Sequence, residues 1–186
     1  MIDLLLNYLS NSSAITFIVL AVLSAYLILT FWIFIYRFMS LNTLVINEEK
    51  SLNALTSKSS FVNPLSSLQK CANGAKQKEL LQACEISIIK DASVGVSWLS
   101  IISSTSPFVG LFGTVVGILE SFAKFSTHSK VGFSIIAPAI SEALVATAAG
   151  IFVAIFAYTF HQLLVRKIYE LDTYLKAQTK ILVSKG

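Results

Sequence analysis

The feature that most constrains this chain is the placement of its charged residues, which leaves three long apolar stretches almost free of charge. Residues 4–36, 92–123 and 131–165 contain no charged side chain other than Glu120 and Glu142. Each stretch is longer than the roughly 20 residues that a helix needs to cross a bilayer. Charged residues make up only 13% of the chain, against about 25% in a soluble domain. The sequence therefore predicts an all-α integral membrane protein with three transmembrane helices.

The distribution of Lys and Arg predicts the orientation of these helices. Of the 14 basic residues, none precedes the first stretch, seven lie within 37–90, two within 124–130 and five within 166–185. Segments rich in Lys and Arg stay in the cytoplasm. The predicted segments are a periplasmic N-terminus (1–13), transmembrane helix 1 (14–37), a cytoplasmic helical segment (38–97), transmembrane helix 2 (98–125), a periplasmic loop (126–132), transmembrane helix 3 (133–164) and a cytoplasmic C-terminal helix (165–186).

The second and third apolar stretches are longer than a bilayer requires. As one helix, residues 92–123 would extend over about 48 Å, whereas the hydrocarbon core is about 30 Å thick. We therefore expect helices 2 and 3 to continue into a cytoplasmic helical region. An apolar stripe at helical spacing supports this for the C-terminal helix, and it consists of Leu164, Ile168, Leu171, Leu175 and Leu182.

The cytoplasmic segment before helix 2 is expected to be partly helical. Its part 47–62, rich in Ser, Asn and Lys, is predicted to be less ordered, and Asn63 followed by Pro64 predicts a helix start. Cys71 and Cys84 are 13 residues apart without a second cysteine pair, so neither a disulfide framework nor a metal site is predicted. Because the cytosol is reducing, we expect both cysteines to be small packing residues.

The three predicted transmembrane helices differ in their small residues. Helix 1 contains no glycine and many large apolar side chains, which suits lipid contact and a peripheral position. Helices 2 and 3 each carry a line of small residues, which lets helix backbones approach closely in a membrane. The lines are Gly110, Gly113, Thr114, Gly117 and Ser121 in helix 2, and Ala139, Ala143, Thr147, Gly150, Ala154 and Ala157 in helix 3. Helix packing without any further role would also explain them.

Two threonines on these lines, Thr114 and Thr147, are predicted near the middle of the bilayer. Counted along the helices, they lie about 16 Å and about 21 Å below the outer surface. A hydroxyl both donates and accepts hydrogen bonds, so it is able to hold a water molecule or a partner's carboxylate. The alternative is that each hydroxyl bonds only the carbonyl four residues earlier in its own helix.

Further polar residues and prolines lie inside the spans. Glu142 is the only carboxylate well inside a span, a costly position that is often functional. It is predicted either to join a proton path or to anchor the outer end of helix 3, and it does not share a helix face with Thr147. Pro107 and Pro138 predict helix kinks, because each frees a backbone carbonyl. His161 is expected to be an interfacial histidine rather than a proton relay.

Several functional classes are disfavoured. The net charge of +4 does not indicate nucleic-acid binding, because the basic residues lie on one side of the membrane and not on a folded face. The sequence contains no phosphate-binding glycine loop, zinc-protease motif or nucleophile elbow. With no nucleophile–base pair or metal cluster in the spans, no catalytic residue, metal or organic cofactor is predicted.

Two sequence blocks carry a family resemblance. Residues 106–118, SPFVGLFGTVVGI, resemble the second-span signature of the MotA/TolQ/ExbB proton channel family, and residues 137–150, APAISEALVATAAG, resemble its third-span signature. Together the similar region covers roughly residues 98–160. Three spans with the N-terminus outside match the TolQ/ExbB branch, whereas the flagellar stator branch has four spans.

The resemblance implies a homopentamer in the inner membrane of Gram-negative bacteria, with protons as the coupling ion. Helices 2 and 3 would line a central pore, and a dimer of a TolR/ExbD-type single-span protein would occupy it. An aspartate of that partner would carry the proton past Thr114 and Thr147, and Glu142 also matches a position of the family motif. Proton flow would rotate the pentamer and drive a TolA/TonB-type protein. Val116 departs from the family, in which an aromatic residue is common at this position.

The predicted function is therefore an inner-membrane proton-channel subunit that couples the proton motive force to work on the cell envelope. Tol-Pal envelope integrity and division is the preferred role, and energised TonB-dependent uptake is the alternative. Two other classes stay open. A self-contained channel or transporter would need intramembrane charges of its own, of which only Glu142 is available. A structural scaffold without ion flow would explain the small-residue lines but not the paired threonines.

Overall fold

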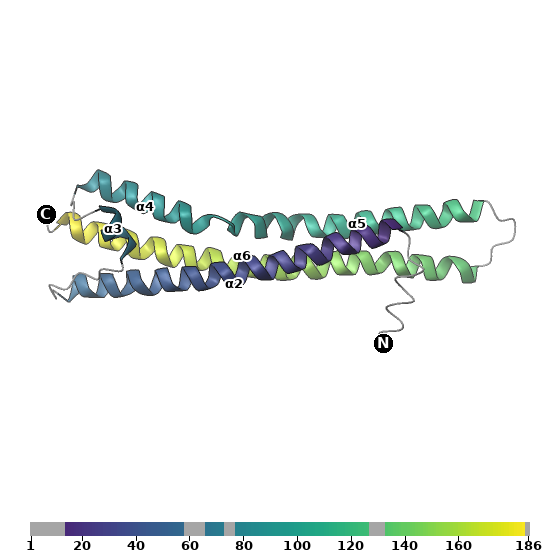
Figure 1. Ribbon diagram of the computed structural model, residues 1–186, viewed down its shortest axis with the longest axis horizontal. Coiled ribbons are helices and arrows are strands. Elements are labelled where there is room, and N and C mark those ends of the chain that lie inside the picture. Colours follow the sequence, from purple (N-terminus) through teal and green to yellow (C-terminus); the bar gives the residue numbers. More distant parts are fainter. Residues whose placement is uncertain (1–13, 58–65, 73–76, 127–132, 185–186) are drawn as a thin grey trace. The chain divides into compact units, whose positions relative to one another are not determined.

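The computed structural model describes residues 14–57, 66–72, 77–126 and 133–184, and these residues form helices with no strand among them (Figure 1). The helices are α2 (Ala14–Thr56), α3 (Ser67–Ala72), α4 (Lys78–Ser93), α5 (Val96–Ser126) and α6 (Phe133–Ser184). Three of them, α2, α5 and α6, contain stretches long and apolar enough to cross a membrane. An all-α chain with three candidate membrane spans is thus confirmed, while the orientation stays a prediction.

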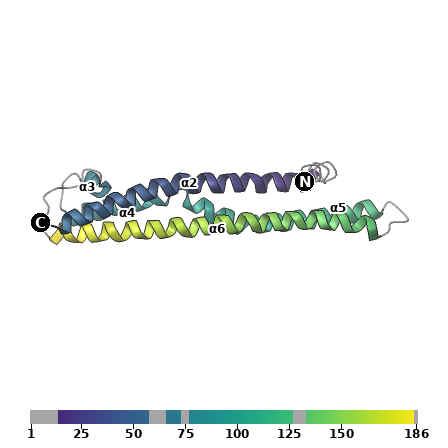
Figure 2. The same cartoon turned by 90° about the horizontal axis from the view of Figure 1, so that it is seen from below.

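Two of the helices run well beyond the predicted spans. Helix α6 is a single helix of 52 residues (Figure 2), so the predicted transmembrane helix 3 and C-terminal helix are consecutive parts of one element. Helix α2 has 43 residues and reaches Thr56, so the expectation of lower order in 47–56 is wrong. Neither Gly nor Pro interrupts 14–56 or 151–184, which favours a continuous helix over these two ranges, while the first part of α6 continues through Pro138 and Gly150. The predicted helix start at Asn63 and Pro64 lies outside the described residues.

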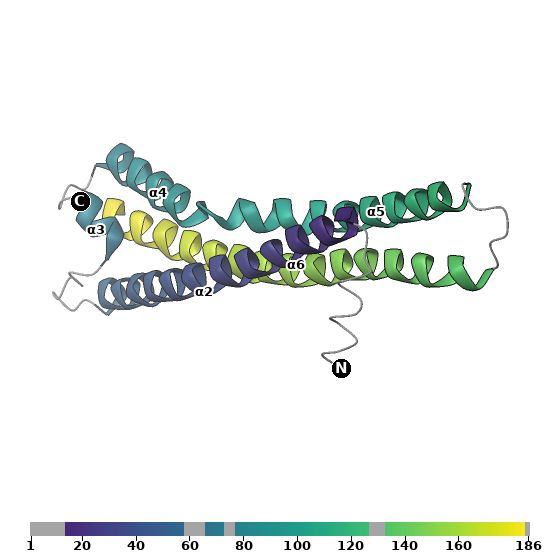
Figure 3. The same cartoon turned by 45° about the vertical axis from the view of Figure 1, so that its right-hand side comes forward.

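The second apolar stretch is interrupted, in contrast to the expected continuation of helix 2. A turn at Val94 and Gly95 separates α4 from α5 (Figure 3). Gly95 has φ +85°, a left-handed conformation that glycine adopts without steric cost. The Arg37 side chain lies beside it, where a Cβ on Gly95 would be 3.2 Å from Nε. Arg37 Nη1 donates to the Asp91 carbonyl at 3.5 Å, so a carbonyl in the last turn of α4 gains a partner.

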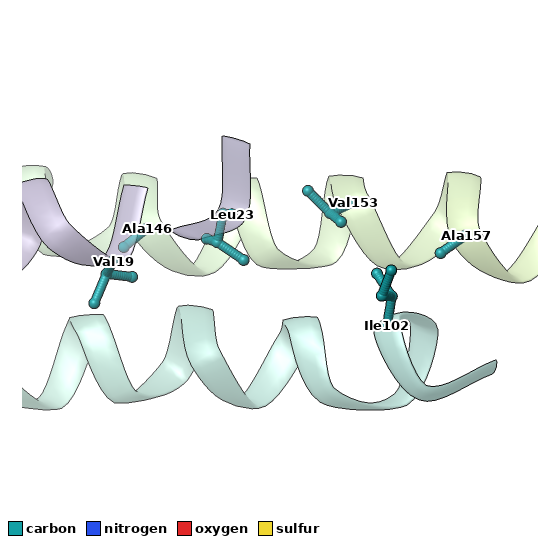
Figure 4. Close-up of a cluster of buried hydrophobic side chains, with 6 residues drawn as sticks. All are labelled: Val19, Leu23, Ile102, Ala146, Val153 and Ala157. Atoms are coloured by element: carbon teal, nitrogen blue, oxygen red, sulfur yellow. The ribbon is translucent and has the colours of Figure 1, made fainter. Parts of the chain in front are cut away.

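The chain divides into two compact units. Unit 1 comprises Met1–Phe31 and Trp98–Thr159, and unit 2 comprises Trp32–Ser97 and Phe160–Gly186. The core of unit 1 combines side chains of three helices (Figure 4), namely Val19 and Leu23 of α2, Ile102 of α5, and Ala146, Val153 and Ala157 of α6. Helix α2 therefore contributes to the core, although large side chains such as Ile18 and Ile28 stay exposed. The predicted lipid-facing surface of helix 1 is only part of that helix.

The interior of unit 2 is built mainly from leucines. Leu164, Leu171 and Leu175 of α6 are fully buried, and this confirms the predicted apolar stripe. The polar side of α6 carries ion pairs, including the half-buried Lys167 and Glu170 at 2.9 Å. This separation of buried leucines from charged residues is typical of an amphipathic helix.

The two cysteines are paired. Cys71 of α3 and Cys84 of α4 form a disulfide, with their Cα atoms 5.8 Å apart. The prediction that they are separate packing residues is wrong. Helix α3 packs against α4 (Figure 3), so two positions that are 13 residues apart come side by side, which spacing along the sequence alone does not reveal.

Candidate functional site

The contact between α5 and α6 in unit 1 is made by glycines whose backbones touch. A Cβ added to Gly110 would lie 2.7 Å from the carbonyl oxygen of Ala146, and one added to Gly150 would lie 2.6 Å from that of Ser106. Both distances are too short for a side chain. The two helices therefore approach as closely as backbones allow, which maximises van der Waals contact where hydrophobic driving force is absent.

The same face of α5 continues with two more glycines. A Cβ on Gly113 would meet the Val19 side chain of α2 at 2.9 Å and the Ala146 side chain at 3.0 Å, and one on Gly117 would meet the Ala143 side chain at 3.1 Å. The small-residue face of α5 thus contacts both α2 and α6.

The remaining members of the predicted small-residue lines are placed as follows. Ser121 donates to the Gly117 carbonyl at 2.7 Å within its own helix. Ala143 is buried, whereas Ala154 is half-buried. Residues 138 and 139 belong to α6, but the side chains of Pro138 and Ala139 lie outside the described part of the structure.

The structure brings Thr114 of α5 and Thr147 of α6 together. Their hydroxyl oxygens are in direct hydrogen-bonding contact. The Gly110 carbonyl oxygen lies 3.2 Å from each hydroxyl, and the Ala143 carbonyl oxygen lies 3.3 Å from that of Thr114. Thr114 has the own-helix bond to Gly110, four residues earlier, and also reaches the Ala143 carbonyl of α6. Thr147 reaches the Gly110 carbonyl across the helix interface.

Counting donors and acceptors shows what this threonine pair is able to bind. Two hydroxyl hydrogens face three acceptors, which are the other hydroxyl and the carbonyls of Gly110 and Ala143. Each hydroxyl oxygen also has two lone pairs, so accepting capacity is left over at the pair. Thr114 is only 8% exposed, while Thr147 is half-buried. An outside hydrogen-bonding group therefore reaches the pair from the Thr147 side.

The other predicted site residues lie elsewhere on α5 and α6. Glu142 is half-buried on α6, five residues from Thr147 and thus on a different side of the helix. Pro107 lies inside α5 without ending it. In unit 2, His161 is half-buried and lines a cavity of about 230 Å³ with residues of α4, α5 and α6.

Two hydroxyls that the sequence did not single out are also buried in unit 1. The side-chain oxygens of Thr30 and Ser106 have no hydrogen-bond partner within the described part of the chain, and both residues are fully buried. A buried hydroxyl without a partner is costly. Ser106 directly precedes Pro107, and its carbonyl oxygen is the atom nearest to Gly150. Among the residues singled out in the sequence, Pro107 was the signal next to Ser106.

Unit 2 contains a buried carboxylate that sequence reasoning missed. Glu48 of α2 is fully buried. Its Oε2 accepts from the Ser66 hydroxyl at 2.8 Å and from Gln178 Nε2 at 2.9 Å. Its Oε1 accepts from the Ser67 amide at 2.5 Å, at the first residue of α3. Glu48 thereby caps α3, since a carboxylate satisfies free amides at a helix N-terminus.

The Glu48 network extends through further side chains. Gln178 of α6 also donates to the Glu48 carbonyl at 3.0 Å and accepts from Ser51 at 3.1 Å. Glu48, Ser51 and Gln178 are all fully buried. No period or motif signals such a network, because its members come from three helices. We assign it a structural role in unit 2.

Between α4 and α6, unit 2 forms an open groove of about 870 Å³, lined by residues that include Lys78, Glu85, Lys176 and Lys180. Burial, followed by the nearby Asp172 carboxylate, raises the pKa of Glu85 above its ordinary value. Thr179 donates a hydrogen bond to Glu85 at 3.4 Å, which favours the charged form but does not outweigh the two opposing effects.

The sequence model of the MotA/TolQ/ExbB proton channel family matches residues 54–177, about two thirds of the chain. The chain belongs to this family. The match extends well beyond the region that carried the sequence resemblance, and it includes the threonine pair and much of unit 2.

Individual relatives place the chain in the TolQ/ExbB branch. A Helicobacter pylori (strain ATCC 700392 / 26695) protein named biopolymer transport protein ExbB-like 1 is 41% identical over 188 residues, covering all of both chains. ExbB of Pseudomonas putida is 39% identical over 99 residues, 52% of this chain and 30% of its own. TolQ of Pseudomonas aeruginosa is 52% identical over 58 residues, 31% of this chain and 25% of its own. The family is one of channel and transport subunits, not of enzymes.

Proposed function

We propose that this chain is a proton-channel subunit of the bacterial inner membrane, which couples the proton motive force to work on the cell envelope. The observation that carries the proposal is the hydroxyl contact between Thr114 and Thr147, in an apolar unit of a proton channel family member. Both threonines lie within candidate membrane spans, Val96–Ala123 and Ile140–Ser184.

The threonine pair needs a titratable partner. A hydroxyl does not gain or lose a proton near neutral pH, so it accompanies proton transfer without carrying the proton. A carboxyl group of a TolR/ExbD-type single-span partner would supply the missing function. The pair would accept a hydrogen bond from the protonated acid, and a hydroxyl that turns away from a backbone carbonyl would donate one to the carboxylate.

The magnitudes support such a pairing. A hydrogen bond to a charged group contributes about 1.5–3 kcal/mol. One charge that crosses 100 mV gains about 2.3 kcal/mol. The hydrogen-bond free energy and the free energy gained from the membrane potential are comparable. The threonine pair is therefore able to stabilise a carboxylate inside the membrane, and the membrane potential is still sufficient to move the proton on.

Exposed apolar faces of unit 1 support an assembly in the membrane. On α5, Phe108, Phe112 and Leu119 are 70%, 59% and 62% exposed, and on α6 Ile155 is 58% exposed. Contiguous apolar surface of this kind is covered by lipid or by another protein. We propose a homopentamer whose pore holds the partner dimer and whose motion drives a TolA/TonB-type protein, with the N-terminus periplasmic and the C-terminus cytoplasmic.

The proposal is tested by replacing Thr147 with Val, which keeps the shape and removes the hydroxyl. Proton flux is measured in proteoliposomes that contain the chain and its co-purified single-span partner. We expect flux to fall about 10- to 100-fold, the equivalent of one hydrogen bond to a charge, and Thr147→Ser to restore it.

The matched control is Thr159→Val on the same helix. Thr159 is exposed, and its hydroxyl donates only to the Ile155 carbonyl at 2.8 Å among the contacts described. This variant should conduct like the wild type. Wild-type flux in Thr147→Val, at an unchanged oligomer mass, would remove the threonine pair from the mechanism and favour a scaffold without ion flow.

For the biological role of this subunit, we propose an ExbB-type function that energises outer-membrane uptake. The support is the full-length similarity to the Helicobacter pylori protein named as ExbB-like. The second candidate is a role in the Tol-Pal system, which the sequence alone favoured. It is supported by the 52% identity to a TolQ segment. Native mass spectrometry after co-expression with each candidate single-span partner distinguishes them by which partner is retained, and in how many copies.

A further inference from the structure

The Cys71–Cys84 disulfide is a second candidate site, and the proposed proton channel does not use it. It joins α3 to α4 within unit 2. The surrounding segment, residues 37–90, carries seven Lys and Arg residues, and such segments remain on the cytoplasmic side. Cytosolic thiols are kept reduced, so a disulfide found there is usually transient. We propose that Cys71 and Cys84 form a reversible thiol–disulfide exchange site whose state controls the docking of α3.

The two cysteines differ in accessibility. Cys71 is exposed, whereas Cys84 is only 3% exposed. A thiol from solution therefore approaches the disulfide from the Cys71 side. Lys70, which precedes Cys71 and is also exposed, gives this side a positive charge, which favours attack by an anionic thiolate. The reagent class that fits is a small, negatively charged cellular thiol.

The exchange reaction balances in two steps. A thiolate of the small thiol attacks Cys71 Sγ, the bond between the two cysteine sulfurs breaks, and Cys84 leaves as a thiolate that takes a proton from water. A second thiolate then attacks the small-thiol sulfur of the mixed disulfide. Cys71 leaves as a thiolate, and the oxidised small-thiol disulfide departs with the net loss of two electrons from the reductant. Oxidation of the site is the reverse sequence.

Reduction acts on an element that has little stability of its own. Helix α3 has six residues, far fewer than an isolated helix needs. It is attached at its first residue by Glu48 and at its fifth residue by the disulfide. Its own Leu68 and Ala72 side chains are buried, and Gln69 donates to the Ser51 hydroxyl of α2 at 3.3 Å. Loss of the disulfide leaves the Glu48 cap, this hydrogen bond and a small apolar contact, so the open form of α3 becomes more populated.

The reversibility is tested on the full-length wild-type chain in native membranes, without denaturant. Samples equilibrated with reduced or oxidised glutathione are quenched with acid and labelled with a maleimide-linked polymer that shifts the gel mobility of each free thiol. We expect two labels after reduction, none after oxidation, and full interconversion. A disulfide that persists in reduced glutathione would overturn the proposal, as would a thiol pair that does not close in oxidised glutathione.

The accessibility argument has its own check in single variants under reducing conditions. Cys84→Ser leaves the exposed Cys71, and Cys71→Ser leaves the buried Cys84. We expect Cys71 to be alkylated at least about tenfold faster than Cys84, in line with the dependence of thiol reactivity on exposure. Equal rates would contradict entry from the Cys71 side.

The coupling to α3 is measured by hydrogen exchange. A closed loop of this length changes the opening equilibrium on the order of 100-fold, so amides of Ser67–Ala72 should exchange about 100-fold faster after reduction. A peptide from residues 150–159 of unit 1 serves as the internal control. The double variant Cys71→Ser/Cys84→Ser should exchange fast with or without reductant. Exchange that is equal in the oxidised and reduced wild type would overturn the link between the disulfide and α3. These measurements involve no proton flux, so they stand or fall separately from the channel proposal.

Discussion

Units 1 and 2 hold helices together in different ways. In unit 1, glycines allow the backbones of α5 and α6 to touch, and hydroxyls bond carbonyls across the contact. In unit 2, leucines fill the interior, and the hydrogen bonds of a buried carboxylate and a disulfide join the helices. Lipid is as apolar as leucine, so leucine burial gains little between helices in a membrane, whereas close contact and hydrogen bonds remain effective.

The large buried side chains follow the same division. Among the twelve largest fully buried side chains of the described residues, Leu23, Thr30 and Leu99 belong to unit 1, and the other nine belong to unit 2. Unit 2 is thus packed as a water-soluble helical domain is packed, by apolar burial. The charged residues, which are concentrated in the sequence of unit 2, agree with this.

The largest expected effect comes from removing the polar centre of unit 2. Glu48→Ala leaves the Ser66 hydroxyl and the Ser67 amide without this acceptor, while Gln178 keeps only its bond to the carbonyl of residue 48. Each orphaned group costs about 1–3 kcal/mol. Thermal unfolding of the purified chain in lipid nanodiscs should show a clear loss. Glu49→Ala, at an exposed neighbouring position, is the control, and equal melting of the two variants would show that the network contributes no stability.

A smaller effect is expected from adding a methyl group to unit 1. Gly150→Ala forces a Cβ to within 2.6 Å of a backbone oxygen, and such overpacking costs about 1–3 kcal/mol. Gly117→Ala meets only the Ala143 side chain at 3.1 Å, and alanine favours the helix by up to about 1 kcal/mol. The two variants should therefore differ in melting temperature, with only Gly150→Ala destabilised. If both melt like the wild type, backbone contact does not hold unit 1 together.

The sequence predicted the parts of this fold that follow from local patterns. Charge-free stretches gave the three spans, the leucine stripe gave the buried face of α6, and helical spacing placed Thr114 and Thr147 at similar depth. The Glu48 network and the disulfide depend on helices that meet only in the folded chain, so no pattern along the sequence signals them. The turn at Gly95 was missed because a single glycine within an apolar run is compatible with a continuous helix.

The smallest effect concerns the pH dependence of unit 2. Because the pKa of Glu85 is raised in the folded state, the folded chain binds more protons than the unfolded chain above pH 4.5, the ordinary pKa of a glutamate. Stability therefore falls as pH rises through the raised pKa and is then constant. Glu85→Gln removes this loss.

Melting curves between pH 4 and 8 check this sign. At pH 7 the Glu85→Gln variant should melt slightly higher than the wild type, by no more than about 2 °C for a partly exposed group. The difference should shrink toward pH 4. Glu79→Gln, at an exposed position of α4, should show no such trend, and a difference that grows on acidification would reverse the assigned sign.

The contact between Gly110 and Gly150 limits how mutations of this chain can be compensated. A damaging substitution at either glycine presses on backbone atoms of the other helix. No second mutation is able to remove these atoms, because every residue type has the same backbone. Gly113 differs, because its missing Cβ would meet only side-chain atoms, and a change of Val19 to alanine would remove the nearest of them, at 2.9 Å, leaving the Ala146 contact at 3.0 Å. Genetic selections should therefore recover second-site suppressors in α2 for lesions at Gly113, and only true revertants for lesions at Gly110 or Gly150.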